Sequence, residues 1–220
     1  MMGRMQPRPL VIIGAGGFGR EVADVVHAIN TAGNGPVFEL QGYIDDNLSD
    51  LSLLNRRGER FLGTCDDLPR YASAVFVVGV GNPAARRALD ARAVKAGLDP
   101  ATLIHPSATV GRDVQLGDGC IVCSHVSITT HVLLGRHTHL NLNCTVGHDV
   151  VVGDFVTVNP GATISGNVTL DDDVSVGTNA AVIQSVTIGP RSTVGAGAAV
   201  VRNVAADTTV VGVPARPIAR

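Results

Sequence analysis

The chain has 220 residues and a formal net charge of −2, with 17 basic and 19 acidic side chains. This length allows two small domains, and the nearly balanced charge offers no basic field for nucleic acid. Apolar runs are short and broken by Gly and Asp, so none approaches the ~20 residues of a membrane span. Residues 1–9 are polar and contain two prolines, and the apolar stretch that follows is too short for a signal peptide. We therefore expect a cytoplasmic protein.

The first hundred residues alternate between strand and helix patterns. Buried strands are predicted at residues 10–13, 37–44 and 74–80. A helix is expected from the first strand to about Asn30, and a helix rich in Ala and Arg after the third. This order predicts a βαβ-type sheet. A linker near residues 97–102 then leads to the rest of the chain, which places the two domains at 1–100 and 101–220.

A glycine-rich loop, Gly14-x-Gly16-x-x-Gly19, lies between the first strand and its helix. Backbone N–H groups and the helix dipole favour a diphosphate at such a place. Asp45 and Asp46 end the next strand, where their oxygens can accept hydrogen bonds from a ribose or a base. The alternative is a tight turn beside a solvated acidic loop. A dinucleotide oxidoreductase is disfavoured because the second mononucleotide-binding unit is missing.

From Ile104 to Val200 every sixth residue is aliphatic, over seventeen consecutive positions. A small or β-branched residue stands four positions after each, and glycine often follows the aliphatic directly, as at Gly111, Gly147 and Gly153. A period of six fits neither an α-helix nor an alternating strand. It predicts a parallel β-helix in which three hexapeptides close one coil. The aliphatic and small columns should fill the interior, and glycine should supply positive φ at the corners.

The cysteines and most histidines have ordinary interpretations. Cys120 and Cys144 occupy interior columns, and the C-x-x-C of Cys120 and Cys123 is better explained by reduced core thiols than by a zinc or redox site. Three histidines six residues apart point to successive faces, which argues against a metal centre and favours polar surface positions. They are His125, His131 and His137.

His148 differs from these because Asp149 stands beside it. Thr130 is expected one coil before it, and His131 one coil before Asp149. The small Gly166 one coil after His148 leaves room for a ligand. A carboxylate that holds one imidazole nitrogen leaves the other as a proton acceptor. His148 is therefore a candidate general base, with a plain surface histidine as the alternative.

These features together resemble the sialic acid O-acetyltransferase (NeuD)/PglD-like family of hexapeptide-repeat sugar acetyltransferases. Closest in type are its nucleotide-amino-sugar N-acetyltransferases, the bacillosamine and perosamine enzymes. The resemblance runs from about Pro9 to Ile218 and includes the spacing from Asn141 to His148-Asp149 and the end Val211-Gly212-Val213-Pro214-Ala215-Arg216. It implies a Rossmann-like N-terminal domain, a left-handed parallel β-helix, a homotrimer, acetyl-CoA as co-substrate, and no metal.

The resemblance also implies roles for individual residues. His148 would be the general base, and Asp149 would orient it. The nucleotide sugar would be held by Gly14, Gly16, Gly17, Asp45, Asp46, Gly81 and Asn82, with Asn141 near its amine. Acetyl-CoA would contact Gly166, Ala196, Pro214, Ala215 and Arg216. One position departs from the pattern, because many relatives carry a second histidine nine residues after the base, where this chain has Thr157.

The expected activity is N-acetylation of a nucleotide-linked amino sugar by direct attack on the thioester of acetyl-CoA. His148 would accept the proton, and the Gly166 N–H is the candidate donor to the oxyanion. Two other functions stay open. One is O-acetylation of a sugar of the sialic acid type, and the other is a non-catalytic trimeric scaffold that binds a nucleotide sugar. A metal-dependent hexapeptide enzyme is disfavoured, because His131, His137 and His148 have no evident arrangement for a shared ion.

Overall fold

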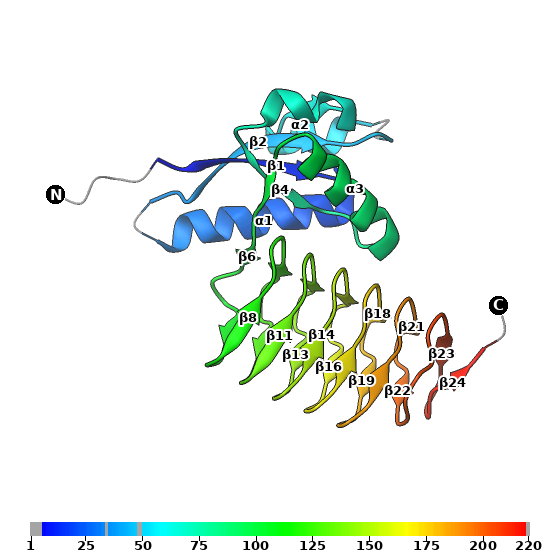
Figure 1. Ribbon diagram of the computed structural model, residues 1–220. Coiled ribbons are helices and arrows are strands. Elements are labelled where there is room, and N and C mark those ends of the chain that lie inside the picture. Colours follow the sequence, from blue (N-terminus) through cyan, green and yellow to red (C-terminus); the bar gives the residue numbers. More distant parts are fainter. Residues whose placement is uncertain (1–5, 34, 48–49, 219–220) are drawn as a thin grey trace. The chain divides into compact units, whose positions relative to one another are not determined.

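The computed structural model describes residues 6–33, 35–47 and 50–218, and the chain divides into two compact units (Figure 1). Residues 1–81 and 85–106 form the first unit, and residues 82–84 and 107–220 form the second. The first unit thus extends beyond the boundary placed at residue 100. Within the described part of the chain, no helix has both the length and the apolar character needed to cross a bilayer.

The first unit contains a five-stranded parallel sheet in the order β3-β2-β1-β4-β5. Its elements are β1 (Arg8–Ile13), α1 (Gly17–Ala32), β2 (Phe38–Ile44), α2 (Ser52–Arg57), β3 (Phe61–Gly63), a 3₁₀ helix (Cys65–Tyr71), β4 (Val75–Val78), α3 (Pro83–Lys95) and β5 (Asp99–Pro100). The predicted strands and helices are present. The expected linker is different, because β5 pairs with β4 inside it.

β1 is the central strand because its side chains are apolar on both faces. Leu10, Val11 and Ile12 are fully buried, and Ile13 is nearly so, as expected for a parallel strand covered from both sides. α1 packs with one stripe of small and branched residues, including Val22 and Val26 one turn apart. The core of this unit therefore fixes the carboxyl end of β1, where the glycine-rich loop begins.

The second unit is a left-handed β-helix with a strand in almost every hexapeptide. Its strands form three sheets, β22-β19-β16-β13-β10-β7, β20-β17-β14-β11-β8 and β24-β23-β21-β18-β15-β12-β9-β6. From β6 to β19 each strand pairs with the strand three hexapeptides further along the chain, as Ile128 does with Val146, which confirms the predicted coil. Figure 1 shows these coils stacked in chain order.

The strand bounds of this β-helix are β6 (Leu103–Ile104), β7 (Thr109–Val110), β8 (Val114–Leu116), β9 (Ile121–Val122), β10 (Ser127–Ile128), β11 (Val132–Leu134), β12 (His139–Leu140), β13 (Thr145–Val146), β14 (Val151–Val152), β15 (Thr157–Val158), β16 (Thr163–Ile164), β17 (Thr169–Leu170), β18 (Ser175–Val176), β19 (Ala181–Val182), β20 (Thr187–Ile188), β21 (Thr193–Val194), β22 (Ala199–Val200), β23 (Thr209–Val211) and β24 (Arg216–Pro217).

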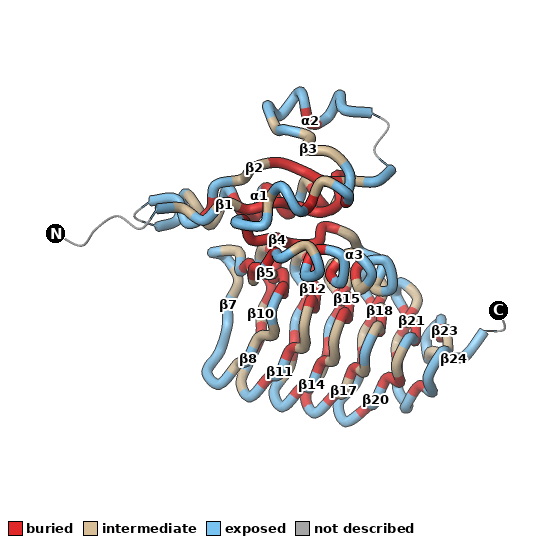
Figure 2. The backbone as a smooth tube through the Cα atoms, turned by 45° about the horizontal axis from the view of Figure 1, so that its top comes forward, coloured by how far each residue is buried: buried red, intermediate tan, exposed pale blue. Residues whose placement is uncertain are grey.

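The aliphatic column fills the interior from Val122 to Val200, where every member is buried. Figure 2 shows buried positions recurring along each coil. The prediction is wrong for the first two members, since Ile104 and Val110 are 36% and 38% exposed. Both lie in the last strand of their sheets, β6 and β7. A strand at the end of a sheet is paired with a coil on one side only, so it gains less burial.

The corner glycines have a different role from the one predicted. Positive φ occurs three residues after the aliphatic position, and it is adopted mostly by Asp, Asn and His, for example Asn143 at 59° and Asp149 at 58°. These residue types tolerate the left-handed region best after glycine. The glycine that follows the aliphatic instead permits close approach between coils. A Cβ on Gly147 would lie 2.6 Å from the backbone nitrogen of Gly166.

Candidate active site

The sheet topology brings three predicted binding segments to one edge of the first unit. The chain moves from β1 to β2 on one side and later returns to β4 on the other side of β1. Parallel α/β sheets bind ligands at the carboxyl ends of the strands where the strand order reverses in this way. The segments that end β1, β2 and β4 contain the glycine-rich loop, Asp45 with Asp46, and Gly81 with Asn82.

The glycine-rich loop combines one tightly packed part with one open part. Gly14 has φ of 103°, and a Cβ on Gly79 would lie 2.6 Å from Cα of Gly19, so α1 packs on the end of β4 at backbone distance. By contrast, a Cβ on Gly16 or Gly17 would have no neighbour within 4 Å. The open side is therefore the start of α1, where N–H groups are exposed for an anion.

Arg20 adds a positive charge at this helix start, which sequence reasoning missed. Its Nη1 donates a hydrogen bond to the Ala15 carbonyl oxygen at 3.0 Å. The first turn of α1 contains no acidic residue, so the guanidinium and the helix dipole act in the same direction. Its position one turn inside the helix, on the side of the loop, was the available sequence signal.

Asp45 is tied to the glycine-rich loop itself. Its Oδ2 accepts a hydrogen bond from the Ala15 N–H at 2.8 Å, and its Oδ1 accepts one from the Asn47 N–H, also at 2.8 Å. The Ala15 N–H is therefore already used, and a diphosphate would have to rely on later N–H groups of the loop. Each carboxylate oxygen keeps a second lone pair, so a contact from Asp45 to a ligand stays a prediction.

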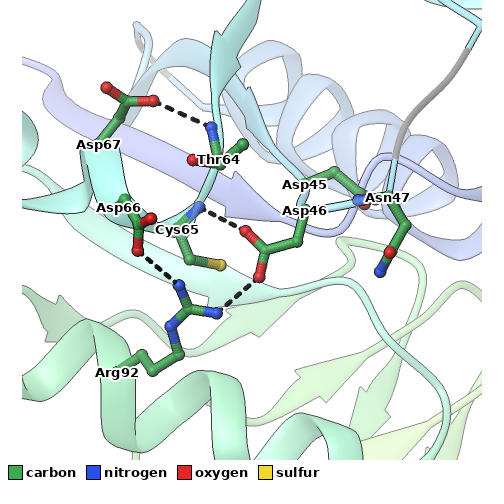
Figure 3. A network of polar contacts seen from close by, with 8 residues as sticks. All are labelled: Asp45, Asp46, Asn47, Thr64, Cys65, Asp66, Asp67 and Arg92. Carbon is green, nitrogen blue, oxygen red and sulfur yellow. Dashed lines mark hydrogen bonds and ion pairs between the residues drawn. The ribbon is translucent and has the colours of Figure 1, made fainter.

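Asp46 belongs to a separate polar network, drawn in Figure 3. Its Oδ1 accepts from the Cys65 N–H at 2.8 Å, and its Oδ2 accepts from Arg92 Nη1 at 2.6 Å. Arg92 also pairs with Asp66 at 3.1 Å. The Cys65 N–H, and after it Arg92, lower the pKa of the Asp46 carboxyl. Asp46 thus joins β2, the 3₁₀ helix and α3, and its predicted contact with a substrate is untested.

In the second unit, His148 and Asp149 form a close pair at the corner between β13 and β14. His148 Nδ1 and Asp149 Oδ2 are 2.7 Å apart, and both side chains are about half exposed. The backbone is fixed on either side, because Asp149 N–H donates to the Thr130 carbonyl and Asn167 N–H donates to the His148 carbonyl. A carboxylate can only accept, so Nδ1 carries the proton and Nε2 is free to take one.

Gly166 lies directly against the imidazole ring, as the three-hexapeptide coil predicts. A Cβ on Gly166 would stand 2.5 Å from Cε1 and 2.6 Å from Nε2 of His148. Within the described residues, the Gly166 N–H donates no hydrogen bond. The ring of His148, with Nε2, therefore packs against the Cα of Gly166, where a side chain would displace it.

The corner that holds His148 continues along later coils to a cavity at the C-terminal end of the β-helix. Positions 166, 184 and 202 follow at the same point of successive coils, and the last is Arg202, about 14 Å away at the usual strand spacing. A cavity of about 370 Å³ is lined there by Arg202, Ala215 and Arg216 among others. Sequence reasoning missed Arg202, although its distance of three coils from His148 was a usable signal.

Asn141 and Ala196 lie away from this corner. They follow β12 and β21, which belong to the eight-stranded sheet, whereas His148 follows β13 of the six-stranded sheet. Asn141 is 7% exposed, and its Nδ2 donates to Asn159 Oδ1 at 3.4 Å. Within one chain the structure does not bring these residues to His148, and their predicted contacts with substrate and acetyl-CoA stay predictions, as does the contact predicted for Pro214.

His137 corrects the expectation of three surface histidines. It is fully buried and stacks on Phe155 with ring centroids 5.5 Å apart. Gly119, one coil before it, has no side chain to push the ring outward, so the imidazole fills the corner. The position at which a second histidine was expected, Thr157, is also buried, and it pairs with His139 in the neighbouring strand.

The cysteines are chemically quiet in this structure. All four are free and buried, and burial raises the pKa of the Cys120 and Cys144 thiols to about 12. Within the described ranges, no three His, Cys, Asp or Glu side chains gather in a group that could hold a metal ion.

An α/β unit with a glycine loop at its strand-order reversal, followed by a β-helix with a His–Asp pair at one corner, defines the class of β-helix sugar acyltransferases. Residues 9–92 match the family described as the PglD N-terminal domain. The GDP-perosamine N-acetyltransferase of Escherichia coli O157:H7 is 32% identical over 139 residues. That match covers 63% of this chain and spans 61% of the length of the curated relative.

Solved structures match over nearly the whole chain. PerB from Caulobacter crescentus, in complex with CoA and GDP-perosamine, has a TM-score of 0.87 at 29% identity and covers 96% of this chain and 97% of its own. The acetyltransferase domain of PglB from Neisseria gonorrhoeae FA1090 has a TM-score of 0.84 at 32% identity, covering 96% and 100%. The chain belongs to the PglD-like family of sugar N-acetyltransferases.

Proposed function

We propose that the chain transfers the acetyl group of acetyl-CoA to the amino group of a nucleotide-linked amino sugar. The observation that carries this proposal is the 2.7 Å contact between His148 Nδ1 and Asp149 Oδ2, which leaves Nε2 basic over Gly166. The PerB and PglB relatives were solved with CoA and GDP-perosamine and with acetyl coenzyme A, respectively. Variants of the Caulobacter enzyme with one histidine replaced were also solved with CoA and GDP-perosamine.

In the proposed reaction the amine nitrogen attacks the thioester carbonyl carbon directly. The C–N bond forms while His148 Nε2 takes a proton from the nitrogen, contributing about 10²–10⁴-fold. Asp149 holds the ring and stabilises the imidazolium. The Gly166 N–H faces the tetrahedral oxyanion. Collapse breaks the C–S bond, and the CoA thiolate leaves and is protonated. The proposed reaction forms no covalent acetyl-enzyme, and burial keeps the Cys120 and Cys144 thiols protonated by raising their pKa to about 12.

The two substrates would be held by different groups of residues. The acetyl-CoA chain would run along the corner from His148 to Arg202 and Arg216, whose charges suit its phosphates. The predicted contacts at Gly166, Ala196, Pro214 and Ala215 belong to this part of the proposal. The nucleotide would occupy the loop with Gly16 and Gly17, near Gly81, Asn82 and the two aspartates.

We further propose a cytoplasmic homotrimer in which a second chain covers the corner from His148 to Arg202 and so completes the acetyl-CoA site. The half-exposed His148 and the exposed apolar residues Leu133 and Val151 on the adjoining sheet support an additional surface there. Light scattering should give three times the chain mass of 22.7 kDa. A monomeric mass for the active protein would contradict this arrangement.

The function is tested by release of free CoA thiol from acetyl-CoA against a panel of nucleotide-linked amino sugars, with His148→Ala in parallel. We expect turnover on one amino sugar and a fall in kcat of about 10²–10⁴-fold in the variant. Activity on hydroxylated sugars alone would move the protein to the O-acetyl branch. Binding of the nucleotide sugar with no turnover on any acceptor would favour the scaffold. Equal rates for wild type and variant would refute the base assignment.

A further inference from the structure

A row of three titratable side chains ends at the carboxylate of the proposed catalytic pair. Asp113, His131 and Asp149 occupy the same corner of three successive coils. Their φ angles are 56°, 55° and 58°, so all three side chains leave the backbone in the same left-handed geometry. The coils are joined beside them by hydrogen bonds from His131 N–H to the Arg112 carbonyl and from Val132 N–H to the Asp113 carbonyl.

The two oxygens of Asp149 face two different histidines. Oδ2 contacts His148 Nδ1 at 2.7 Å, while Oδ1 lies 3.8 Å from His131 Nδ1. On its other side, His131 Nε2 is 3.5 Å from Asp113 Oδ2. Thr130 Oγ1, which donates to the Arg112 carbonyl, lies 3.5 Å from His131 Nδ1. Each ring nitrogen of His131 therefore faces an acceptor. His131 and Asp113 thus extend the contacts of the His148–Asp149 pair over two earlier coils.

We propose that His131 is a positioning residue for the catalytic pair, bridging Asp113 and Asp149 so that the Asp149 carboxylate presents Oδ2 to His148. This inference rests on the proposed function, in which His148 is the base. His131 touches no reacting atom and acts only through Asp149. A carboxylate anchored at one oxygen can rotate about its last bond, whereas the His131 ring beside the second oxygen restricts that rotation.

The row is poorly explained as a stabilising feature of the fold. His131 and Asp113 are both 60% exposed, and Asp149 is 50% exposed. Exposed ion pairs contribute on the order of 0–1 kcal/mol to stability, and the contacts of His131 with the two carboxylates are long, at 3.5 and 3.8 Å. A ring at these distances from Asp149 and Asp113 can still limit the directions that the Asp149 side chain adopts. Removing a group that orients a functional residue typically lowers affinity or activity by about 10–100-fold.

The test replaces His131 with asparagine, which tolerates positive φ and so leaves the backbone undisturbed. We expect kcat to fall about tenfold, with KM for both substrates and the Tm unchanged. In an Asp149→Asn background, His131→Asn should have no further effect, because its action passes through Asp149. His125→Asn is the matched control, since His125 also has positive φ at 58° and forms no ion pair with a carboxylate in the described residues.

A second measurement decides the inference without any turnover. Long-range ¹H–¹⁵N correlation of histidine-labelled protein at about pH 8, where histidine is ordinarily neutral, reports the tautomer of His148. The wild type and His125→Asn should show the proton on Nδ1, and His131→Asn should show a mixture of both tautomers. A single Nδ1 tautomer in His131→Asn, or equal effects of His125→Asn and His131→Asn, would overturn the proposal. If neither the wild type nor any variant transfers an acetyl group, the proposed function fails. The tautomer of His148 in His131→Asn still tests the present inference, because its measurement needs no turnover.

Discussion

At the scale of single residues, the proposed site depends on His148 and equally on Gly166, which has no side chain to displace the imidazole. Gly166 is flat against the His148 ring, and its φ is not in the left-handed region, so its backbone would accept alanine. A methyl group there would occupy the place of Cε1 and Nε2. The imidazole is about half exposed and can rotate away, so the fold would survive while the base is displaced.

Gly166→Ala should therefore lower kcat by about 10²-fold, the cost of moving a catalytic group by an ångström, with an unchanged Tm. Steady-state kinetics and thermal unfolding measure the two effects. Gly147→Ala is the matched control one coil earlier, where the new Cβ would meet backbone atoms of Ser165 and Gly166 at 2.6–2.7 Å. That variant should lose about 1–3 kcal/mol of stability. Full activity in Gly166→Ala would show that the ring is not held over this glycine during catalysis.

The pairing of His148 with Asp149 was predictable because adjacent residues at a corner need no long-range information. The register with Thr130 and Gly166 was predictable as well, since three hexapeptides separate equivalent points of neighbouring coils. The same register placed His131 one coil before Asp149, but which of their atoms face each other was not predictable, because the side-chain directions depend on positive φ at these corners. Burial of His137 was missed for the same reason, since its ring direction is set by Gly119 and Phe155 in the coils around it.

At the scale of elements, the Asp46 network joins three segments of the first unit. Asp46 follows β2, Cys65 begins the 3₁₀ helix and Arg92 lies in α3. Burial, with Asp46 nearby, raises the pKa of the Cys65 thiol to about 11, so the thiol is protonated at neutral pH. Arg92 thus bonds to two carboxylates, Asp46 and Asp66, and of these Asp46 also accepts from the Cys65 N–H.

The pKa of Asp46 is lowered by folding, so its charged form stabilises the folded state above its ordinary value of about 4. That contribution should be lost as the pH falls below about 4 through the lowered pKa. Calorimetry of the full chain should give a lower Tm for Asp46→Asn than for wild type at neutral pH, and the difference should shrink in acid. Asp66→Asn, which removes the 93% exposed partner of the same arginine, should have a smaller effect. A pH-independent difference would contradict this role of the Asp46 charge.

Long periodic elements were predictable, and short ones were not. The seventeen-position aliphatic column defines the β-helix because each coil repeats the same steric demand. The first strands and helices have clear apolar patterns and turn residues. The segment that forms α2, β3 and the 3₁₀ helix, between Ser52 and Tyr71, was missed. These elements are three to seven residues long, and they are held by tertiary contacts such as Asp46 with Cys65.

At the scale of the whole molecule, the proposed function divides binding and chemistry between the two units of the chain. The first unit gathers loops at the reversal of its strand order, a general ligand site that by itself specifies no reaction. The second supplies the base, the adjacent N–H and a row of positions that leads to two arginines. Neither unit alone contains all the groups that acetyl transfer to a nucleotide sugar requires, which is why we place the activity in the full chain.

The product of the proposed reaction is an amide on a nucleotide-linked sugar, formed by direct transfer. Its identity is best established with acetyl-CoA labelled with ¹³C at the carbonyl and the amino sugar that turns over, followed by NMR and mass spectrometry of the isolated product. We expect one labelled acetyl group bonded to nitrogen and resistant to hydroxylamine. A labelled ester that hydroxylamine removes, or label retained on the protein, would contradict direct N-acetylation.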